Sequence, residues 1–76
     1  MNVKINRVYR HYKGGIYRVL AIAKHTENLE DLVVYEALYD NHQIWCRPIS
    51  MWNDNVEYNG MIIKRFQLIE DNNGQI

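Results

Sequence analysis

The sequence predicts an all-β fold: a small, strongly bent antiparallel barrel of five strands, SH3-like, with one short helical turn. Three observations lead to this prediction. The dominant hydrophobic period is two rather than 3.6, the strand-like runs are rich in β-branched and aromatic residues, and short turn-rich connections separate them. Small barrels pair their own edge strands and fill their interior with side chains, which suits a chain of 76 residues.

The first half of the chain predicts a hairpin and a third strand. Residues 7–13 and 16–25 both alternate, and Gly14-Gly15 between them is able to adopt the positive φ angles of a tight turn. Centring the turn there places residues whose numbers sum to about 29 opposite each other. An acidic connection, TENLED, leads to a third strand at 32–39.

The second half predicts the remaining strands. The turn YDNH precedes a fourth strand at 43–49, which Pro48 ends or places at a sheet edge. Ser50 is a possible N-cap for one helical turn in SMWNDN, Gly60 marks a further turn, and residues 65–69 form the closing strand. We expect a single small barrel domain at 1–70 and a frayed polar tail at 71–76.

Composition narrows the class of protein. Nine basic residues balance nine acidic ones, which argues against a general polyanion binder, although a local basic patch remains open. One cysteine, Cys46, allows no intrachain disulfide. No apolar run has the length of a signal peptide or a membrane span, so we expect a soluble, cytoplasmic protein with no membrane association.

Trp45 and Arg47 form the first candidate site. They lie two residues apart on one strand face, where a guanidinium stacks on an indole or directs its planar fork at a carboxylate or phosphate. Tyr35 from the neighbouring strand would complete the surface. The alternative is a buried tryptophan covered by the arginine stem.

His11 and Lys13 share a face with Tyr9 beside the glycine turn and form the second candidate. They provide either hydrogen-bond donors for an anionic or planar ligand, or a histidine that satisfies backbone groups next to a solvated lysine.

His25, Thr26 and Glu27 resemble a catalytic trio at the end of the second strand. Adjacent strand residues point to opposite faces, so a Glu-His relay has poor geometry here, and we favour Thr26 and Glu27 as caps of the following turn. The register places His25 far from His11.

The spacing of residues in the sequence argues against metal binding and against nucleophilic catalysis. His42 and Cys46 share a strand face but lie about 13 Å apart at four strand steps, too far for one ion. We expect His42 to be solvated and Cys46 to be a small core residue. Ser50 lacks a nearby histidine, and KGG is a turn rather than a phosphate cradle. No catalytic residue, metal ligand or cofactor is predicted.

The sequence resembles a bacterial and phage family, the domain of unknown function 1653. Four spaced elements carry the resemblance: Tyr-x-His-Tyr-Lys-Gly, Ala-x-His-Thr-Glu, Val-Val-Tyr and Trp-x-Arg-Pro, within Val8 to Phe66. The activity of the family is not established. Its pattern covers His11, Lys13, Gly14, His25, Thr26, Glu27, Tyr35, Trp45, Arg47 and Pro48. Cys46 replaces the usual valine and Trp52 a common phenylalanine, and both replacements suit packing positions.

The resulting hypothesis is a small binding module without a catalytic cycle of its own. Its ligand would be a small anionic or planar group, from a nucleotide-like metabolite or a peptide. The expected ligand-binding residues are His11, Lys13, Tyr35, Trp45 and Arg47, with His25 and Glu27 as further candidates. An RNA- or DNA-contact module and a small hydrolase with a histidine base are the alternatives. The sequence does not indicate an oligomeric state.

Overall fold

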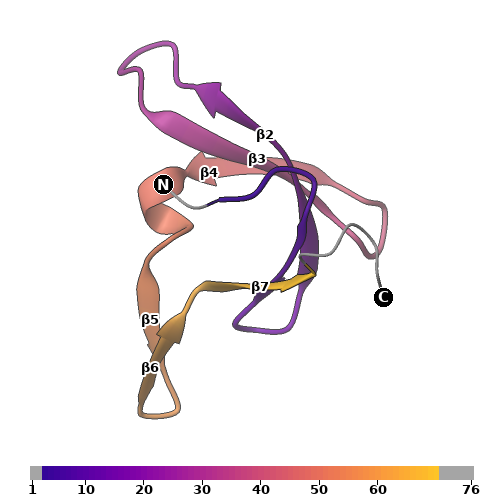
Figure 1. Cartoon of the computed structure of the whole chain (residues 1–76), viewed down its shortest axis with the longest axis vertical. Helices are drawn as coiled ribbons and strands as arrows, with labels where there is room; N and C mark the ends of the chain where they lie inside the picture. The colour runs from indigo at the N-terminus through magenta and orange to yellow at the C-terminus, as the bar shows by residue number, and fades with distance from the viewer. Residues whose placement is uncertain (1–2, 71–76) are drawn as a thin grey trace.

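The computed structural model describes residues 3–70 as an all-β fold with seven strands and one short helix. Five strands form one antiparallel sheet in the order β4-β3-β2-β1-β7, and β5 and β6 form a separate hairpin (Figure 1). The bounds are β1 Val8–His11, β2 Ile16–Lys24, β3 Asp31–Ala37, β4 Ile44–Pro48, η1 Ile49–Met51, β5 Asn55–Tyr58, β6 Met61–Lys64 and β7 Phe66–Glu70. The all-β class and the presence of one short helical turn are confirmed, but Pro48 rather than Ser50 is the N-cap, and Ser50 lies inside the turn. The polar tail at 71–76 lies outside the described residues.

The predicted closure into a five-stranded, SH3-like barrel is not confirmed. Within residues 3–70 the edge strands β4 and β7 do not pair with each other, so the sheet stays open. The chain between them forms η1 and a hairpin that pairs with itself, with Tyr58 opposite Met61. In Figure 1 this hairpin projects away from the five-stranded sheet. Strands β5 and β6 were not predicted, although Asn-Gly between apolar runs is the strongest short hairpin signal. Asn59 and Gly60 have φ angles of 54° and 79°, as a type I′ turn requires.

The first turn differs from the prediction by three positions in register. Tyr9 pairs with Tyr17 and Arg10 with Ile16, so paired residue numbers sum to 26 rather than 29. The N–H of Gly14 donates to the carbonyl of His11 at 2.7 Å, and Gly14 alone has a positive φ, of 109°. A three-residue loop that ends in a left-handed glycine therefore replaces a turn centred between the two glycines.

Two irregularities bend the sheet. The pairing of β2 with β3 shifts between Val19 and Ala21, and the pairing of β1 with β7 shifts between Val8 and Tyr9. A bulge increases local twist and changes which residues face inward. Beyond the first bulge, Ile22 rather than Ala21 lies opposite the buried Val33. The simple alternation predicted along 16–25 therefore fails at Leu20.

The core lies on the concave side of the sheet, and Trp52 is its largest fully buried side chain. The ring of Trp52 stacks on Phe66 with centroids 3.7 Å apart and contacts Tyr9 and Tyr35 edge-on. These contacts join the residue after η1 to β7, β1 and β3. The Trp52 indole therefore covers the aromatic side chains on the concave side of the open sheet. The buried cluster comprises Tyr9, Val19, Val33, Tyr35, Trp52 and Phe66.

Candidate functional site

Strand register gathers aromatic and basic side chains on the concave face, in a group that we call the Arg47 cluster: His11, Tyr17, Tyr35, Trp45, Arg47 and Phe66. His11 pairs with Phe66 between β1 and β7, and Tyr35 pairs with Trp45 between β3 and β4. Directly paired residues point to the same face of a sheet. Residues far apart in the sequence therefore share one surface.

The guanidinium of Arg47 is held over aromatic rings. Its Nε donates to the hydroxyl of Tyr35 at 3.1 Å, and its Nη1 donates to the carbonyl of Met51 at 3.2 Å. Its Cζ lies 5.2 Å from the Phe66 ring centroid and 5.8 Å from that of Tyr35. An arginine has five N–H donors, and these two bonds leave most of them available to an anion. Within residues 3–70 no carboxylate forms an ion pair with Arg47.

His11 lies beside this guanidinium in a neutral form. Its ring contacts Phe66 at 4.9 Å between centroids, and its Nδ1 accepts the backbone N–H of Lys13 at 3.2 Å. An accepting Nδ1 places the proton of the neutral ring on Nε2. Burial lowers the pKa of His11, and the positive charges of Arg47, Arg65 and Lys13 lower it further. The ring therefore offers one N–H donor next to Arg47.

Arg65 and Asp54 form an ion pair next to the cluster. Arg65 Nε and Nη2 donate to the two carboxylate oxygens of Asp54 at 2.8 and 2.9 Å. The hydrogen bonds from Arg65 lower the pKa of Asp54, which burial alone would raise. The charge of Arg47 also lowers the pKa of Asp54, but both carboxylate oxygens of Asp54 accept hydrogen bonds from Arg65, so the N–H donors of Arg47 are not used by this carboxylate. Sequence reasoning missed this pair, which lies eleven residues apart.

Tyr17 and Tyr39 lie at another side of the Arg47 cluster. Their hydroxyl oxygens lie 2.6 Å apart, and the Tyr17 ring contacts Tyr35 and Phe66 edge-on. Burial and the hydrogen bond to Tyr39 raise the pKa of Tyr17 to about 12. Tyr17 is therefore neutral near pH 7. The sequence signal for Tyr17 is the alternation along residues 16–25, which places Tyr17 on the same face as the buried Val19.

Of the predicted ligand-binding residues, the structure places His11, Tyr35, Trp45 and Arg47 on one face. Lys13 is exposed in the β1–β2 turn, with Nζ 5.8 Å from the Tyr12 ring centroid. Trp45 is 55% exposed on the edge strand β4. The predicted alternative of a buried Trp45 is therefore wrong, and the guanidinium of Arg47 lies over Tyr35 and Phe66 instead.

His25 and Glu27 lie in the β2–β3 turn, outside the Arg47 cluster. His25 Nδ1 accepts the backbone N–H of Glu27 at 3.1 Å. The backbone of His25 also closes the turn, through its N–H to Glu30 and its carbonyl from Leu29. The contact between the two residues thus runs from ring to backbone, not from ring to carboxylate.

Cys46 differs from its predicted surroundings, whereas His42 is exposed, as expected of a solvated side chain. Cys46 is exposed rather than buried, because β4 is an edge strand and Cys46 alternates with Trp45 and Arg47. His42 is exposed and places Nδ1 3.1 Å from a carboxylate oxygen of Glu36. In the part of the chain that the structure describes, no group of three or more His, Cys, Asp or Glu side chains is arranged to hold a metal ion. No helix among those residues is long and apolar enough to span a membrane.

This open antiparallel sheet with an aromatic and basic concave face defines a small all-β domain. The chain belongs to the family described as "Protein of unknown function (DUF1653)", which its residues 7–68 match. It is also similar to a DUF1653 protein of known crystal structure from Bordetella bronchiseptica. The two share 31% sequence identity over 95% of each chain, with a TM-score of 0.79. No curated protein matches the sequence.

Proposed function

We propose that the domain is a binding module without a catalytic cycle, which recognises an anionic or planar group of a metabolite or peptide on the Arg47 cluster. The main support for this proposal is that the guanidinium of Arg47 is held in a fixed position by its neighbours. Tyr35, Phe66 and the Met51 carbonyl hold it in place without a carboxylate. A pre-positioned arginine loses less side-chain entropy when it binds an anion.

The neighbouring groups support the same ligand chemistry. His11 adds an N–H donor, and the exposed indole of Trp45 adds apolar area on the same face. Lys13 extends the positive charge at the turn. The finer predictions of a bacterial or phage origin and a cytoplasmic location stay predictions.

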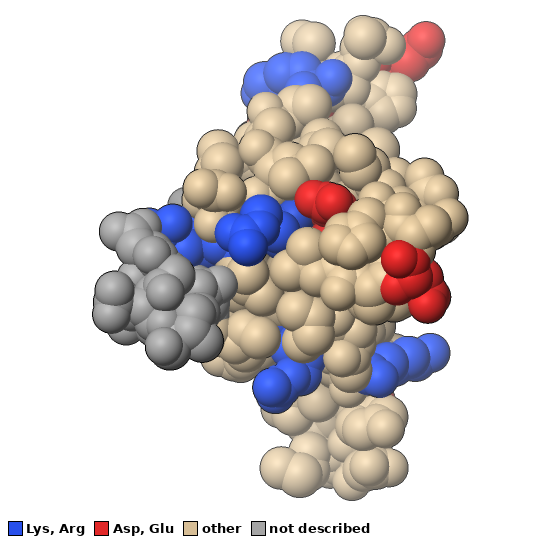
Figure 2. All heavy atoms as spheres, turned by 90° about the vertical axis from the view of Figure 1, so that its right-hand side faces the viewer, with Lys and Arg blue, Asp and Glu red and all other residues tan. Residues whose placement is uncertain are grey.

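Two observations weigh against the alternatives. A histidine base needs a free acceptor nitrogen, and Nδ1 of both His11 and His25 already accepts a backbone N–H. A nucleic-acid module needs a continuous basic surface. On the face shown in Figure 2, basic and acidic side chains are both present among uncharged residues.

The test is a backbone-amide NMR titration with an acidic peptide, nucleoside monophosphates and a short oligonucleotide. We expect saturable shifts at His11, Tyr35 and Arg47 with the peptide or the nucleotides. Arg47→Gln should weaken binding about tenfold or more, because hydrogen bonds to charged groups contribute ~1.5–3 kcal/mol. Arg18→Gln is the matched control, since Arg18 also donates to a main-chain carbonyl, that of Asn6, but lies off the concave face.

Unchanged affinity in a folded Arg47→Gln variant would overturn the proposal. So would the absence of saturable shifts at these residues with every probe. Binding of the oligonucleotide alone, with affinity that falls steeply as salt rises, would replace it with the nucleic-acid alternative.

A further inference from the structure

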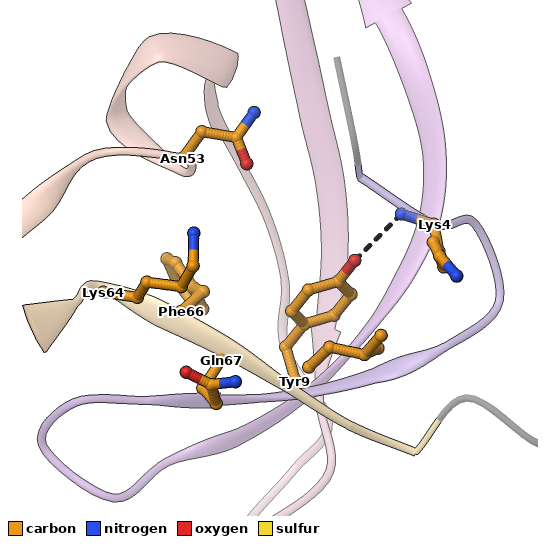
Figure 3. Close-up of a pocket in the computed structure, with 7 residues that line it drawn as sticks. Lys4, Tyr9, Asn53, Lys64, Phe66 and Gln67 are labelled. Carbon is orange, nitrogen blue, oxygen red and sulfur yellow. Dashed lines mark hydrogen bonds between the residues drawn. The ribbon is translucent and has the colours of Figure 1, made fainter.

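A separate pocket lies on another side of Phe66, between the N-terminal segment, the residue that follows Trp52 and the junction of β6 with β7 (Figure 3). Its volume is about 510 Å³, within the range of small-molecule sites in proteins. The lining residues are Lys4, Tyr9, Asn53, Lys64, Phe66, Gln67 and Leu68. Arg47 and His11 are not among them, so an inference about this pocket does not rest on the proposed function.

The floor of the pocket is apolar and rigid. Tyr9 and Phe66 are almost fully buried, and Phe66 is fixed by its stack on Trp52. Leu68 packs against the same core. Aromatic floors of this kind provide area for a flat ligand at low entropic cost.

The rim carries hydrogen-bonding groups of two kinds. The side-chain amide of Asn53 presents a donor and an acceptor, which is the pattern that reads the edge of a heteroaromatic ring. The hydroxyl of Tyr9 accepts the backbone N–H of Lys4 at 2.9 Å and keeps its own proton to donate. Figure 3 shows the amide of Asn53 and the amino group of Lys64 directed into the same space.

The charge of the lining is positive. Lys64 contributes a cation, and none of the lining residues is acidic. A ligand that uses both parts of the pocket therefore combines a planar ring with a negative group. We propose that this pocket is a second binding site, which takes a planar heteroaromatic compound with an anionic substituent, as in a nucleoside monophosphate. Asn53 contacts the ring edge and Lys64 contacts the anion.

The experiment compares three probes by amide NMR: adenosine monophosphate, adenosine and inorganic phosphate. The expected result is saturable shifts at Asn53, Lys64, Phe66 and Gln67 with the nucleotide, weaker binding of adenosine, and no saturable shift there with phosphate. Lys64→Gln should weaken nucleotide binding about tenfold and leave adenosine binding unchanged, because it removes only the cation.

A second variant adds a negative charge to the rim with little change in shape. Gln67→Glu should weaken nucleotide binding more than adenosine binding, through repulsion of the anionic group. Gln43→Glu in the exposed β3–β4 turn is the matched control and should bind like the wild type. Wild-type-like spectra show that each variant is folded.

Three results would overturn the inference: no saturable shift at these residues with either nucleotide or adenosine, wild-type affinity in both pocket variants, or equal affinity for inorganic phosphate and the nucleotide. Arg47→Gln separates the two proposals. It should weaken binding as reported by His11, Tyr35 and Arg47 and leave the shifts at Asn53, Lys64 and Gln67 unchanged, whereas Lys64→Gln should do the reverse.

Discussion

The β1–β2 and β2–β3 turns share one local design and differ in their surroundings. In each, a histidine lies at a strand end, His11 as the last residue of β1 and His25 as the first after β2, and its Nδ1 accepts the N–H of the residue two positions later. Each turn also contains a residue with positive φ shortly before the next strand, Gly14 in the first and Leu29 in the second. Local sequence is thus enough to build the turn.

Only the first histidine has a chemical environment that suits a ligand. The ring of His11 packs against Phe66 and lies near Arg47, and burial lowers its pKa. The turn that follows His25 carries Leu29, which is 69% exposed. A histidine turn therefore becomes a candidate site through the strands that pack against it, and β7 supplies that packing for His11 alone.

The largest expected difference between the turns is in the apolar side chain near each. Phe66→Ala should lower the free energy of unfolding by about 3–5 kcal/mol, because it leaves a cavity beneath His11 and Trp52. Leu29→Ala should change it by less than ~0.5 kcal/mol, since Leu29 is already exposed. Urea unfolding of both variants measures the two costs. Comparable losses would show that the second turn is packed after all.

The second prediction concerns backbone conformation and has opposite signs in the two turns. Gly14→Ala should destabilise the protein by about 1–2 kcal/mol, because φ of 109° strains any residue with a Cβ although no atom lies within 4 Å of it. Leu29→Gly should stabilise it by about 0.5–1 kcal/mol, because Leu29 adopts φ of 60° with little side-chain burial to lose. Thermal and urea unfolding of the pair check both signs. A loss of stability in Leu29→Gly would contradict the account of strain.

Local features of this fold were readable from the sequence. The hairpin at Gly14, the third and fourth strands and the helical turn after Pro48 follow from alternation and turn chemistry. The face shared by Trp45 and Arg47, with Tyr35 opposite, also follows from spacing of two and from the pairing of consecutive strands.

Features that depend on distant residues were not readable. The bulge after Val19 changes which residues of β2 face the core, and no glycine or proline in the sequence marks its position. The described sheet stays open, and Trp52, which lies outside its strands, covers the core through simultaneous contacts with β1, β3 and β7. The pairing of Arg65 with Asp54 and the pocket beside Phe66 depend on the same tertiary arrangement.

The smallest expected effect, and the most direct test of the comparison, is the pH dependence of stability. The folded-state pKa of His11 lies below its ordinary value of 6.5, so the unfolded chain binds this proton more tightly than the folded one. The contribution of His11 is fully present above the unfolded pKa. It falls as pH drops below about 6.5 and ceases to change below the folded pKa. Urea unfolding from about pH 8 to pH 5 should therefore show stability that declines toward acid.

Two variants assign that decline to one turn. His11→Asn should reduce the slope, because its amide oxygen is able to accept the Lys13 N–H without titrating near neutral pH. His25→Asn makes the same replacement in the other turn and should keep the slope that arises from His11. A proton NMR titration of the His11 ring should give a midpoint below 6.5. A midpoint at or above that value would mean that the ring is not buried beside the positive charges of Arg47, Arg65 and Lys13, and the distinction between the two turns would be lost.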